Sequence, residues 1–137
     1  MYQALELPEG KNFLRARNLA QNTKFINDLR TASSAFEMYA AESDRYPAAA
    51  APGVIPPGMA VYLNGMPWSS TTPIGGLWLW APGQWLATAQ VGVAYASGPG
   101  IPDDVRMSEI DTRMDNGALT TGSFRKQTST DYTHIIE

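Results

Sequence analysis

The sequence contains no cysteine and only one histidine among its 137 residues. The missing thiols exclude disulfide frameworks, thiolate metal sites and cysteine nucleophiles. His134 is the one imidazole that could serve catalysis or metal binding. A zinc site would need three carboxylates to support it, which is rare. The glycine spacings match neither a dinucleotide-binding nor a phosphate-binding loop. We therefore expect neither a metal nor a cofactor.

Charged residues are absent from Tyr46 through Pro102, a stretch that holds all four tryptophans and nine of the ten prolines. Proline and glycine break this stretch too often for a membrane span, which needs about 18 consecutive apolar residues. The N-terminus, MYQALELPEG, lacks the basic and apolar regions of a secretory signal. The formal net charge of −3 argues against bulk nucleic-acid binding. A soluble chain of one domain is the simplest expectation.

Residues 11–43 lack glycine and proline and are rich in helix-favouring residues. Apolar residues recur at spacings of three and four, which predicts a helix with one buried stripe. They are Phe25, Leu29, Ala32, Phe36 and Tyr39/Ala40. Such a helix would be about 45 Å long. This length exceeds the width of a compact head of this size, so part of the helix should protrude. We expect residues 1–10 to be a flexible or replaced N-terminus, 11–45 a stalk helix ending before Pro47, and 46–137 a globular head.

The first half of this helix is basic. Between residues 11 and 30 the positive residues are Lys11, Arg15, Arg17, Lys24 and Arg30, against Asp28 alone. The head, residues 46–137, has four basic and seven acidic residues, a net charge of −3. The basic residues are either simply solvated or face the head of a neighbouring copy, where opposite charges would set the register.

The sequence of the head predicts a small antiparallel sheet with one further short helix. Residues 47–75 form a long proline-rich connection, expected to pack on the core through seven apolar anchors and to include a helical turn near Met59–Leu63. The anchors are Val54, Ile55, Met59, Val61, Tyr62, Leu63 and Trp68. A hairpin follows, with strands at 77–80 and 85–96 around a turn at 81–84. Strands at 123–127 and 132–136 close the sheet.

The short helix is expected to open at Asp103-Asp104, two acids at its positive end, and to stop at Asn116-Gly117. We expect its inward side chains to be Val105, Ile110 and Met114. Together these elements predict an α+β fold in which a long N-terminal helix packs on a small antiparallel sheet.

Both faces of the predicted hairpin are apolar, because Leu77 and Leu79 alternate with Trp78 and Trp80. One face can pack on the long helix. The other must be covered by loop 47–75, by another subunit or by a ligand. The tryptophans then have three interpretations: core filling, which we favour; subunit contact; or an open sheet face, with Trp78, Trp80 and Trp85, that grips polysaccharide or a secreted partner.

Catalysis finds little support. On a strand, Asp131 and His134 point to opposite faces, which does not suit a Ser-His-Asp site. One acidic cluster is present, and it matches no EF-hand spacing. A solvated helix face accounts for it, with calcium binding as the alternative. Its members are Asp103, Asp104, Glu109, Asp111 and Asp115.

A series of short motifs resembles the type IV pilin-like proteins, the pseudopilins of type II secretion. The helix carries Asn12-Phe-Leu-Arg-Ala-Arg-Asn18, Phe25-Ile-Asn-Asp-Leu-Arg30, Phe36-Glu-Met-Tyr39 and Arg45-Tyr-Pro47. The head carries Ile55-Pro-Pro-Gly-Met59, Tyr62-Leu63, Thr72-Pro-Ile-Gly-Gly76, Trp78-x-Trp80, Met107-x-Glu-Ile-Asp111, Gly122-Ser-Phe-Arg-Lys126 and Tyr132-x-x-Ile-Ile-Glu137. In order and spacing these head motifs resemble a prepilin-type subgroup common in bacteria, and the matches span residues 12–137.

The resemblance implies a non-enzymatic filament subunit of the cell envelope or the extracellular space. It implies a homo-oligomer, or assembly with related pilins, and a membrane contact only through an apolar N-terminal half-helix. Here the residues MYQALELPEGK stand in place of that half-helix and its cleavage signal, so we expect a truncated or replaced N-terminus. Leu79 stands where an acidic residue usually separates the two tryptophans, which we interpret as an adaptation to an interface.

Ten residues are the expected interaction residues: Phe25, Leu29, Phe36, Trp78, Leu79, Trp80, Trp85, Leu86, Arg15 and Arg17. In the soluble form, the apolar face of residues 77–86 is expected to drive self-association.

Overall fold

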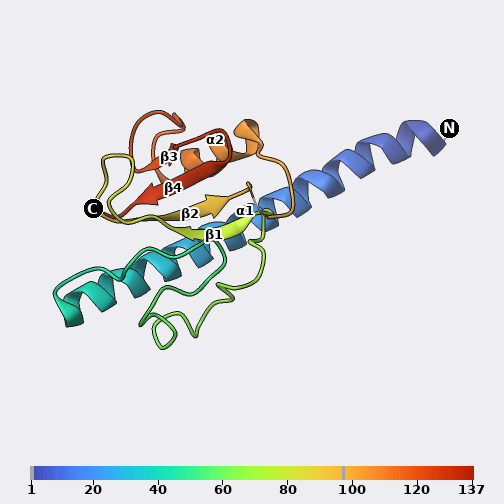
Figure 1. Ribbon diagram of the computed structural model, residues 1–137. Helices are drawn as coiled ribbons and strands as arrows, with labels where there is room; N and C mark the ends of the chain where they lie inside the picture. Colours follow the sequence, from blue (N-terminus) through green and yellow to red (C-terminus); the bar gives the residue numbers. More distant parts are fainter. Residues whose placement is uncertain (1, 97) are drawn as a thin grey trace.

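A long helix lies across one face of a four-stranded antiparallel sheet, and a second, short helix lies beside it (Figure 1). This computed structural model describes the backbone of residues 2–96 and 98–137, and the side chains from Phe13 onward with the same gap. The elements in chain order are α1 (Tyr2–Ser43), β1 (Leu77–Trp80), β2 (Gln90–Ala94), α2 (Asp104–Met114), β3 (Phe124–Lys126) and β4 (Asp131–Ile135). The strand order is β1-β2-β4-β3. The α+β prediction is confirmed.

Helix α1 begins at Tyr2, nine residues before the expected start at residue 11. That residues 1–10 are flexible or replaced stays a prediction, since their side chains lie outside the described residues. At the other end, Asp44 adopts a positive φ of 61° and donates its backbone N–H to the Ala40 carbonyl oxygen at 2.8 Å. This left-handed residue ends the helix as glycine or asparagine often does. The stop therefore precedes the Arg45-Tyr46-Pro47 signal.

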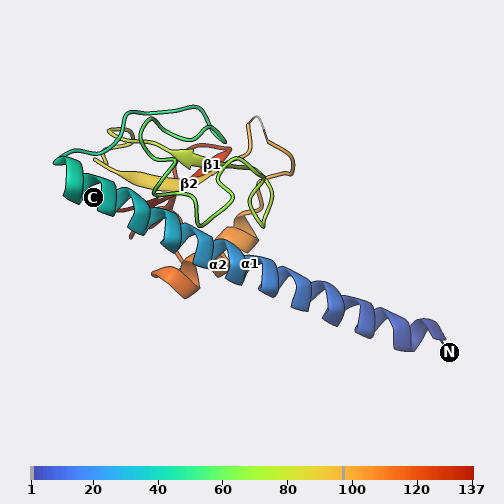
Figure 2. The ribbon, with the colours of Figure 1, turned by 90° about the horizontal axis from the view of Figure 1, so that it is seen from below.

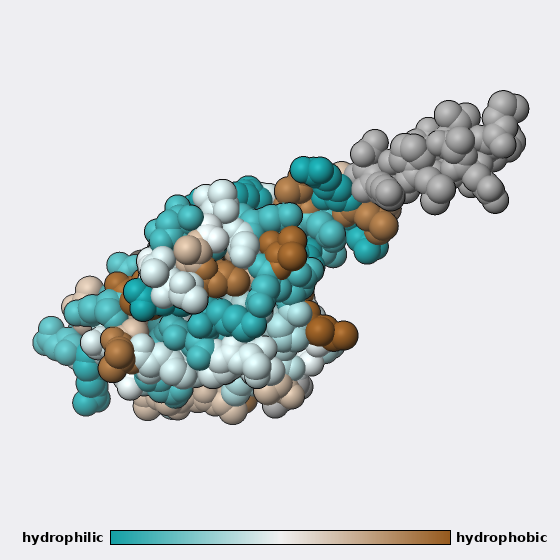
Figure 3. Space-filling model, turned by 90° about the horizontal axis from the view of Figure 1, so that it is seen from above, coloured by the Kyte–Doolittle hydropathy of each residue, from teal (hydrophilic) through white to brown (hydrophobic). Residues whose placement is uncertain are grey.

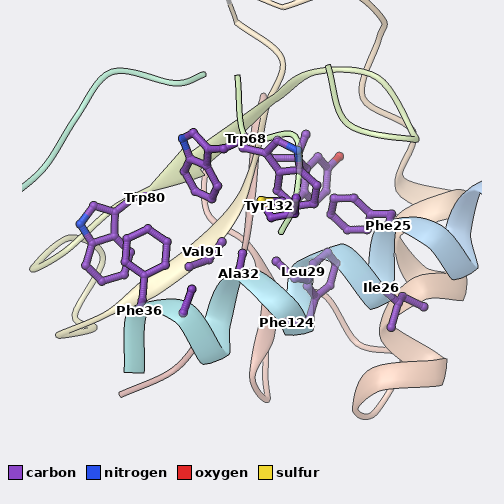
Figure 4. Packing of buried hydrophobic residues seen from close by; sticks show 14 of the residues in the cluster. Phe25, Ile26, Leu29, Ala32, Phe36, Trp68, Trp80, Val91, Phe124 and Tyr132 are labelled. Carbon is purple, nitrogen blue, oxygen red and sulfur yellow. The ribbon is translucent and has the colours of Figure 1, made fainter. Parts of the chain in front are cut away.

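The apolar stripe of α1 forms the core with the sheet (Figure 4), as predicted. Phe25, Leu29 and Phe36 are fully buried. The Phe25 ring stacks on Trp78 with centroids 5.3 Å apart, and the Phe36 ring stacks on Trp80 at 4.0 Å. Such aromatic pairs contribute about 0.5–1.5 kcal/mol beyond the area they bury. The stripe and the two tryptophans thus fix where α1 lies on the sheet.

The connection of residues 47–75 packs beside β1 and completes the core from that side (Figure 2). Its buried apolar side chains are Met59, Leu63, Met66, Trp68 and Ile74. The backbone N–H of Leu63 donates to the Met59 carbonyl oxygen at 2.9 Å, which confirms the helical turn.

Three of the expected anchors in this connection are wrong, because they point to solvent. Val54, Ile55 and Val61 are 53%, 39% and 78% exposed. Proline-rich backbone has no fixed side-chain period, so hydrophobicity alone could not tell the inward residues from the outward ones.

Helix α2 opens at Asp103-Asp104 as expected. The structure adds that Asp103 is the N-cap, since its side chain accepts hydrogen bonds from the backbone N–H groups of Val105 and Arg106. Ile110 is buried, and Met114 is half-buried against the core. The inward prediction for Val105 is wrong, since that side chain is 71% exposed. Met107 takes its place, because only residues three or four apart share a helix face.

Candidate interaction surface

Three of the four tryptophans belong to the core. Trp68, Trp78 and Trp80 are no more than 2% exposed. The Trp80 indole N–H donates to the Pro47 carbonyl oxygen at 3.1 Å, and that of Trp68 donates to the Val54 carbonyl oxygen at 2.9 Å. Core filling, the interpretation we favoured, is confirmed for these residues. The open aromatic face is wrong for Trp78 and Trp80, because both lie between the sheet and α1.

On the opposite face of the hairpin, the hairpin's own loop covers Leu79. Leu79, Ala81 and Ala94 form a small buried cluster, and Trp85 packs against it. Leu79 is only 7% exposed, so it is not the exposed apolar contact that we expected. The cover of Leu79 is Trp85, which was not among the three that we expected. At Leu77 on the same face, loop 47–75 is confirmed as a cover, since a Cβ atom added to its Gly53 would lie 3.4 Å from the Leu77 side chain.

A buried polar network adjoins that cluster. Gln90 is fully buried, and its side-chain oxygen accepts from the Thr133 hydroxyl at 2.6 Å. Its amide nitrogen donates to the Gln84 carbonyl oxygen at 2.6 Å. A buried amide is costly unless its hydrogen bonds are made. Gln90 therefore ties the β1–β2 loop to the middle of the sheet.

The hairpin turns later in the sequence than predicted. The backbone N–H groups of Ala81 and Gly83 donate to the carbonyl oxygens of Gln90 and Thr88, each at 3.0 Å. These bonds continue the register of β1 on β2 up to a turn in which Ala87 donates to Gln84 at 2.9 Å. The predicted turn at 81–84 and the strand starting at Trp85 are therefore wrong. The Pro82-Gly83 pair resembles a turn signal, whereas the actual turn has Trp85 and Leu86 at its centre.

We call residues 84–87 the tip. Both of its central residues have positive φ, 49° for Trp85 and 64° for Leu86. Two-residue turns of this kind favour Asn-Gly, because a side chain clashes with the backbone in the left-handed region. Leu86 is also completely exposed, at 108% of its reference area. The tip therefore presents an apolar side chain in a conformation that leucine disfavours.

Part of α1 extends beyond the head (Figures 1 and 2). We call residues 13–20 the stem, and every side chain in it is exposed. Phe13, Leu14 and Leu19 are 68%, 50% and 45% exposed. Figure 3 shows hydrophobic side chains on this part of the helix, next to the residues drawn in grey. The protruding helix that we predicted is confirmed for the described residues.

The stem leaves the head where α2 holds α1. The Arg106 guanidinium donates to the side-chain oxygens of Asn22 at 2.7 Å and Gln21 at 2.5 Å. Arg113 donates to the Thr23 hydroxyl at 2.9 Å. Sequence reasoning missed these contacts, since more than 80 residues separate the partners and nothing local in the sequence marks them.

Beyond this contact the stem and α2 enclose a hollow of about 620 Å³, which we call the groove. Its lining residues are Leu14, Arg15, Asn18, Leu19, Glu109, Thr112 and Arg113. Arg15 and Arg17 are exposed, and neither forms an ion pair within the described part of the chain.

A second hollow, of about 510 Å³, lies at the end of the head that carries the tip. It is lined by Ala40, Asp44, Arg45, Tyr46, Thr88 and Glu137. Burial and, after it, the neighbouring Glu137 carboxylate raise the pKa of Tyr46 to about 12. Tyr46 is therefore neutral at physiological pH. The two carboxylates, Asp44 and Glu137, outnumber the one cation, Arg45, in this hollow.

The ten expected interaction residues divide into two groups. Six are buried inside the chain. Phe25, Leu29, Phe36, Trp78 and Trp80 belong to the main core, and Leu79 belongs to the small cluster on the opposite face of the hairpin. Trp85 is half-buried, and Leu86, Arg15 and Arg17 are exposed. The residues free to meet a partner therefore lie at the tip and on the stem.

The acidic cluster does not converge on one point. Asp103 caps α2, Asp104 pairs with Lys126 at 2.9 Å, and Asp115 accepts from the Ser123 backbone N–H at 2.7 Å. Across residues 13–96 and 98–137, no group of three or more His, Asp or Glu side chains is arranged to hold a metal ion. His134 and Asp131 are three residues apart on β4, which places them on opposite faces.

Asp111 is fully buried, and neither carboxylate oxygen has a hydrogen bond of standard geometry. Burial and then the Asp115 carboxylate raise its pKa, against an opposing effect of the backbone N–H groups of Asn116 and Gly117. The folded chain thus holds the proton more tightly than the unfolded chain, so the ionised form destabilises the fold at neutral pH. We expect Asp111→Asn to raise the melting temperature at neutral pH.

This gain should shrink as the pH falls and vanish below 3.8, the ordinary pKa of aspartate, because the wild-type carboxyl is then protonated in both states. Melting curves at the two pH values would measure it. Glu109→Gln, at an exposed position of the same helix, is the matched control and should show no such trend. An Asp111→Asn variant that is less stable at neutral pH would contradict the expectation.

Comparisons with protein-family models and with curated proteins found no match. Within the described residues, no helix combines the length and the apolar character that crossing a membrane requires. For contact with a partner, the geometry offers an exposed basic stem at one end of the head and a strained apolar tip at the other.

Proposed function

We propose that the protein is a non-enzymatic structural subunit that assembles with copies of itself, or with related subunits, into a filament of the type IV pilus or type II secretion pseudopilus kind. It would act at the cell envelope or outside the cell. The observation that carries the proposal is the length of α1, which has 42 residues, or about 63 Å at 1.5 Å per residue. Among the residues whose side chains are described, 13–20 are exposed and packing on the head starts at Gln21 and Asn22.

An exposed helical segment gains no tertiary packing from its own head. Isolated helices shorter than about 12–15 residues are marginal in water, and most helices in proteins are stabilised by a packed apolar face. The stem carries three exposed large apolar residues and two arginines that form no ion pair with any described side chain. A surface of this composition is suited to contact with other subunits, and filament assembly would supply that contact on every stem.

A photo-crosslinking experiment tests the proposal. A benzophenone amino acid replaces Arg17 on the stem, and the matched control replaces Val61, which is 78% exposed on the head. Position 17 is expected to crosslink to another copy or to a related subunit in cells and in the concentrated purified protein. The control is expected to give little product. Absence of any chain-to-chain product from position 17 under both conditions would end the proposal.

A further inference from the structure

The tip and the groove complement each other, although they belong to different ends of the molecule. We propose that the tip of one molecule inserts Leu86 into the groove between α1 and α2 of a second copy. This inference rests on the proposed function, and it names the surfaces by which the copies would join.

The tip is built as a rigid apolar projection. The hydrogen bonds from Gly83 to Thr88 and from Ala87 to Gln84 fix its backbone, and the Gln90 side chain holds it from the sheet. Trp85 anchors it on the cluster around Leu79. A side chain held in this way loses little conformational entropy on binding.

The conformation of Leu86 also points to a role outside the monomer. At a φ of 64°, glycine or asparagine would fit with less strain. The leucine buries nothing within its own chain, because it is completely exposed. Backbone strain of this kind is characteristic of functional positions. Leucine at this position disfavours the folded monomer but supplies an apolar group to a partner.

The groove provides a matching socket. Leu14 and Leu19 supply apolar surface along the stem, and both are about half exposed in the monomer. A volume of about 620 Å³ falls in the range of pockets that take up small ligands, so it can admit one leucine side chain. The fixed contacts of Arg106 and Arg113 with residues 21–23 of α1 hold the two walls together, so the socket exists before binding.

The charges around the two surfaces are opposite. Beside the tip, Asp44 and Glu137 outnumber Arg45. In the lining of the groove, Arg15 and Arg113 outnumber Glu109. Opposite potentials steer association and fix its orientation. The same pattern disfavours contact of tip with tip, where like charges would meet.

The tip lies near the C-terminus, at the end of the head away from the protruding part of α1 (Figure 1). Contact of tip with groove is therefore heterologous: each copy offers its tip to one neighbour and its groove to another. Contacts of this type continue as an open chain unless their rotation closes a ring. The inferred contact would therefore propagate a filament.

Disulfide trapping tests the pairing directly, because the chain has no cysteine of its own. Leu86→Cys in one tagged copy is mixed with Leu19→Cys in a copy with a different tag. The expected result is a disulfide-linked mixed dimer that forms faster than products of Leu86→Cys with itself. Val61→Cys mixed with Leu19→Cys, which places a comparably exposed thiol elsewhere on the head, is the control. Equal yields from the two mixtures, or none from the first, would overturn the inference.

Substitution at the tip gives an independent test. Leu86→Gly and Leu86→Asn both suit a positive φ and remove the apolar side chain. Each is expected to weaken self-association, measured by sedimentation, by about tenfold or more, without lowering the melting temperature. Arg15→Glu should weaken it too, whereas Arg30→Glu, the same charge change outside the groove lining, should have less effect.

The outcomes separate this inference from the proposed function. If position 17 crosslinks to other copies but the Leu86 variants associate as strongly as the wild type, the tip is not the contact, and the filament proposal stands. If position 17 gives no product and the trapping mixture gives none, both fail. Weaker association of the Leu86 variants at unchanged melting temperature supports the inference.

Discussion

Replacing Phe36 with alanine is expected to lower the free energy of unfolding by about 3–5 kcal/mol, the usual range for truncating a buried phenylalanine. Phe36 is fully buried and stacks on Trp80 with ring centroids 4.0 Å apart. Its ring also contacts Trp68 at 5.5 Å. The truncation would leave a cavity where α1, the sheet and the connection 47–75 meet, and rigid indole rings on two sides limit the collapse that could fill it.

Urea unfolding followed by circular dichroism would measure the loss. The matched control is Met38→Ala on the same helix, since Met38 is 54% exposed and surface changes of this kind usually stay within about 0.5 kcal/mol. A Phe36→Ala variant as stable as that control would mean that α1 does not depend on its stripe for packing. In that case the position of α1 on the sheet would have to be stabilised by the contacts of α2 instead.

The core around Phe36 was predictable from the sequence only in part. The stripe of α1 and the alternation of Trp78 and Trp80 were predictable because a buried helix face and a pleated strand each impose a fixed period on hydrophobicity. The structure adds that the two periods meet, so that Phe25 and Phe36 each stack on one tryptophan. That pairing depends on the placement of α1 on the sheet, which no local pattern specifies.

The tip could not be predicted for a different reason. A turn with two positive φ angles favours glycine and asparagine, so Pro82-Gly83 was the stronger signal and Trp85-Leu86 resembled a strand. Tertiary contacts override the local preference, because Trp85 covers Leu79 and Gln90 binds the Gln84 carbonyl oxygen. The error falls at the position that we assign to partner contact, which agrees with the rule that local consistency fails most often at functional sites.

The groove, too, could be predicted only in part. Its stem wall was expected from the length of the helix, but its other wall depends on Arg106 and Arg113, which contact residues 21–23 from more than 80 residues away. From the sequence alone, arginines on a short helix predict a solvent-exposed helix face. Only the fold shows that these side chains hold α2 against α1 and so create a hollow beside the stem.

Gly92 is the other position where a single change should have a large effect. It lies in β2 between its cross-strand partners, Leu79 of β1 and Thr133 of β4. A Cβ atom added there would lie 2.6 Å from the Thr133 Cα atom and would clash with the Tyr132 carbonyl oxygen. These obstacles are backbone atoms of the adjacent central strand, so no side-chain rotation relieves them. Gly92→Ala must separate β2 from β4.

We expect Gly92→Ala to cost at least about 3 kcal/mol, the upper range for overpacking a core, and Gly92→Val to prevent folding. Thermal and urea unfolding would measure this against Gly65→Ala, where an added Cβ meets nothing within 4 Å. The cost should also reach the tip, since a separation of β2 from β4 pulls Gln90 away from Thr133 and loosens its hold on Gln84. A Gly92→Ala variant with wild-type stability would show that the strands give way without cost, and that the sheet does not hold the tip as rigidly as its docking into a second copy requires.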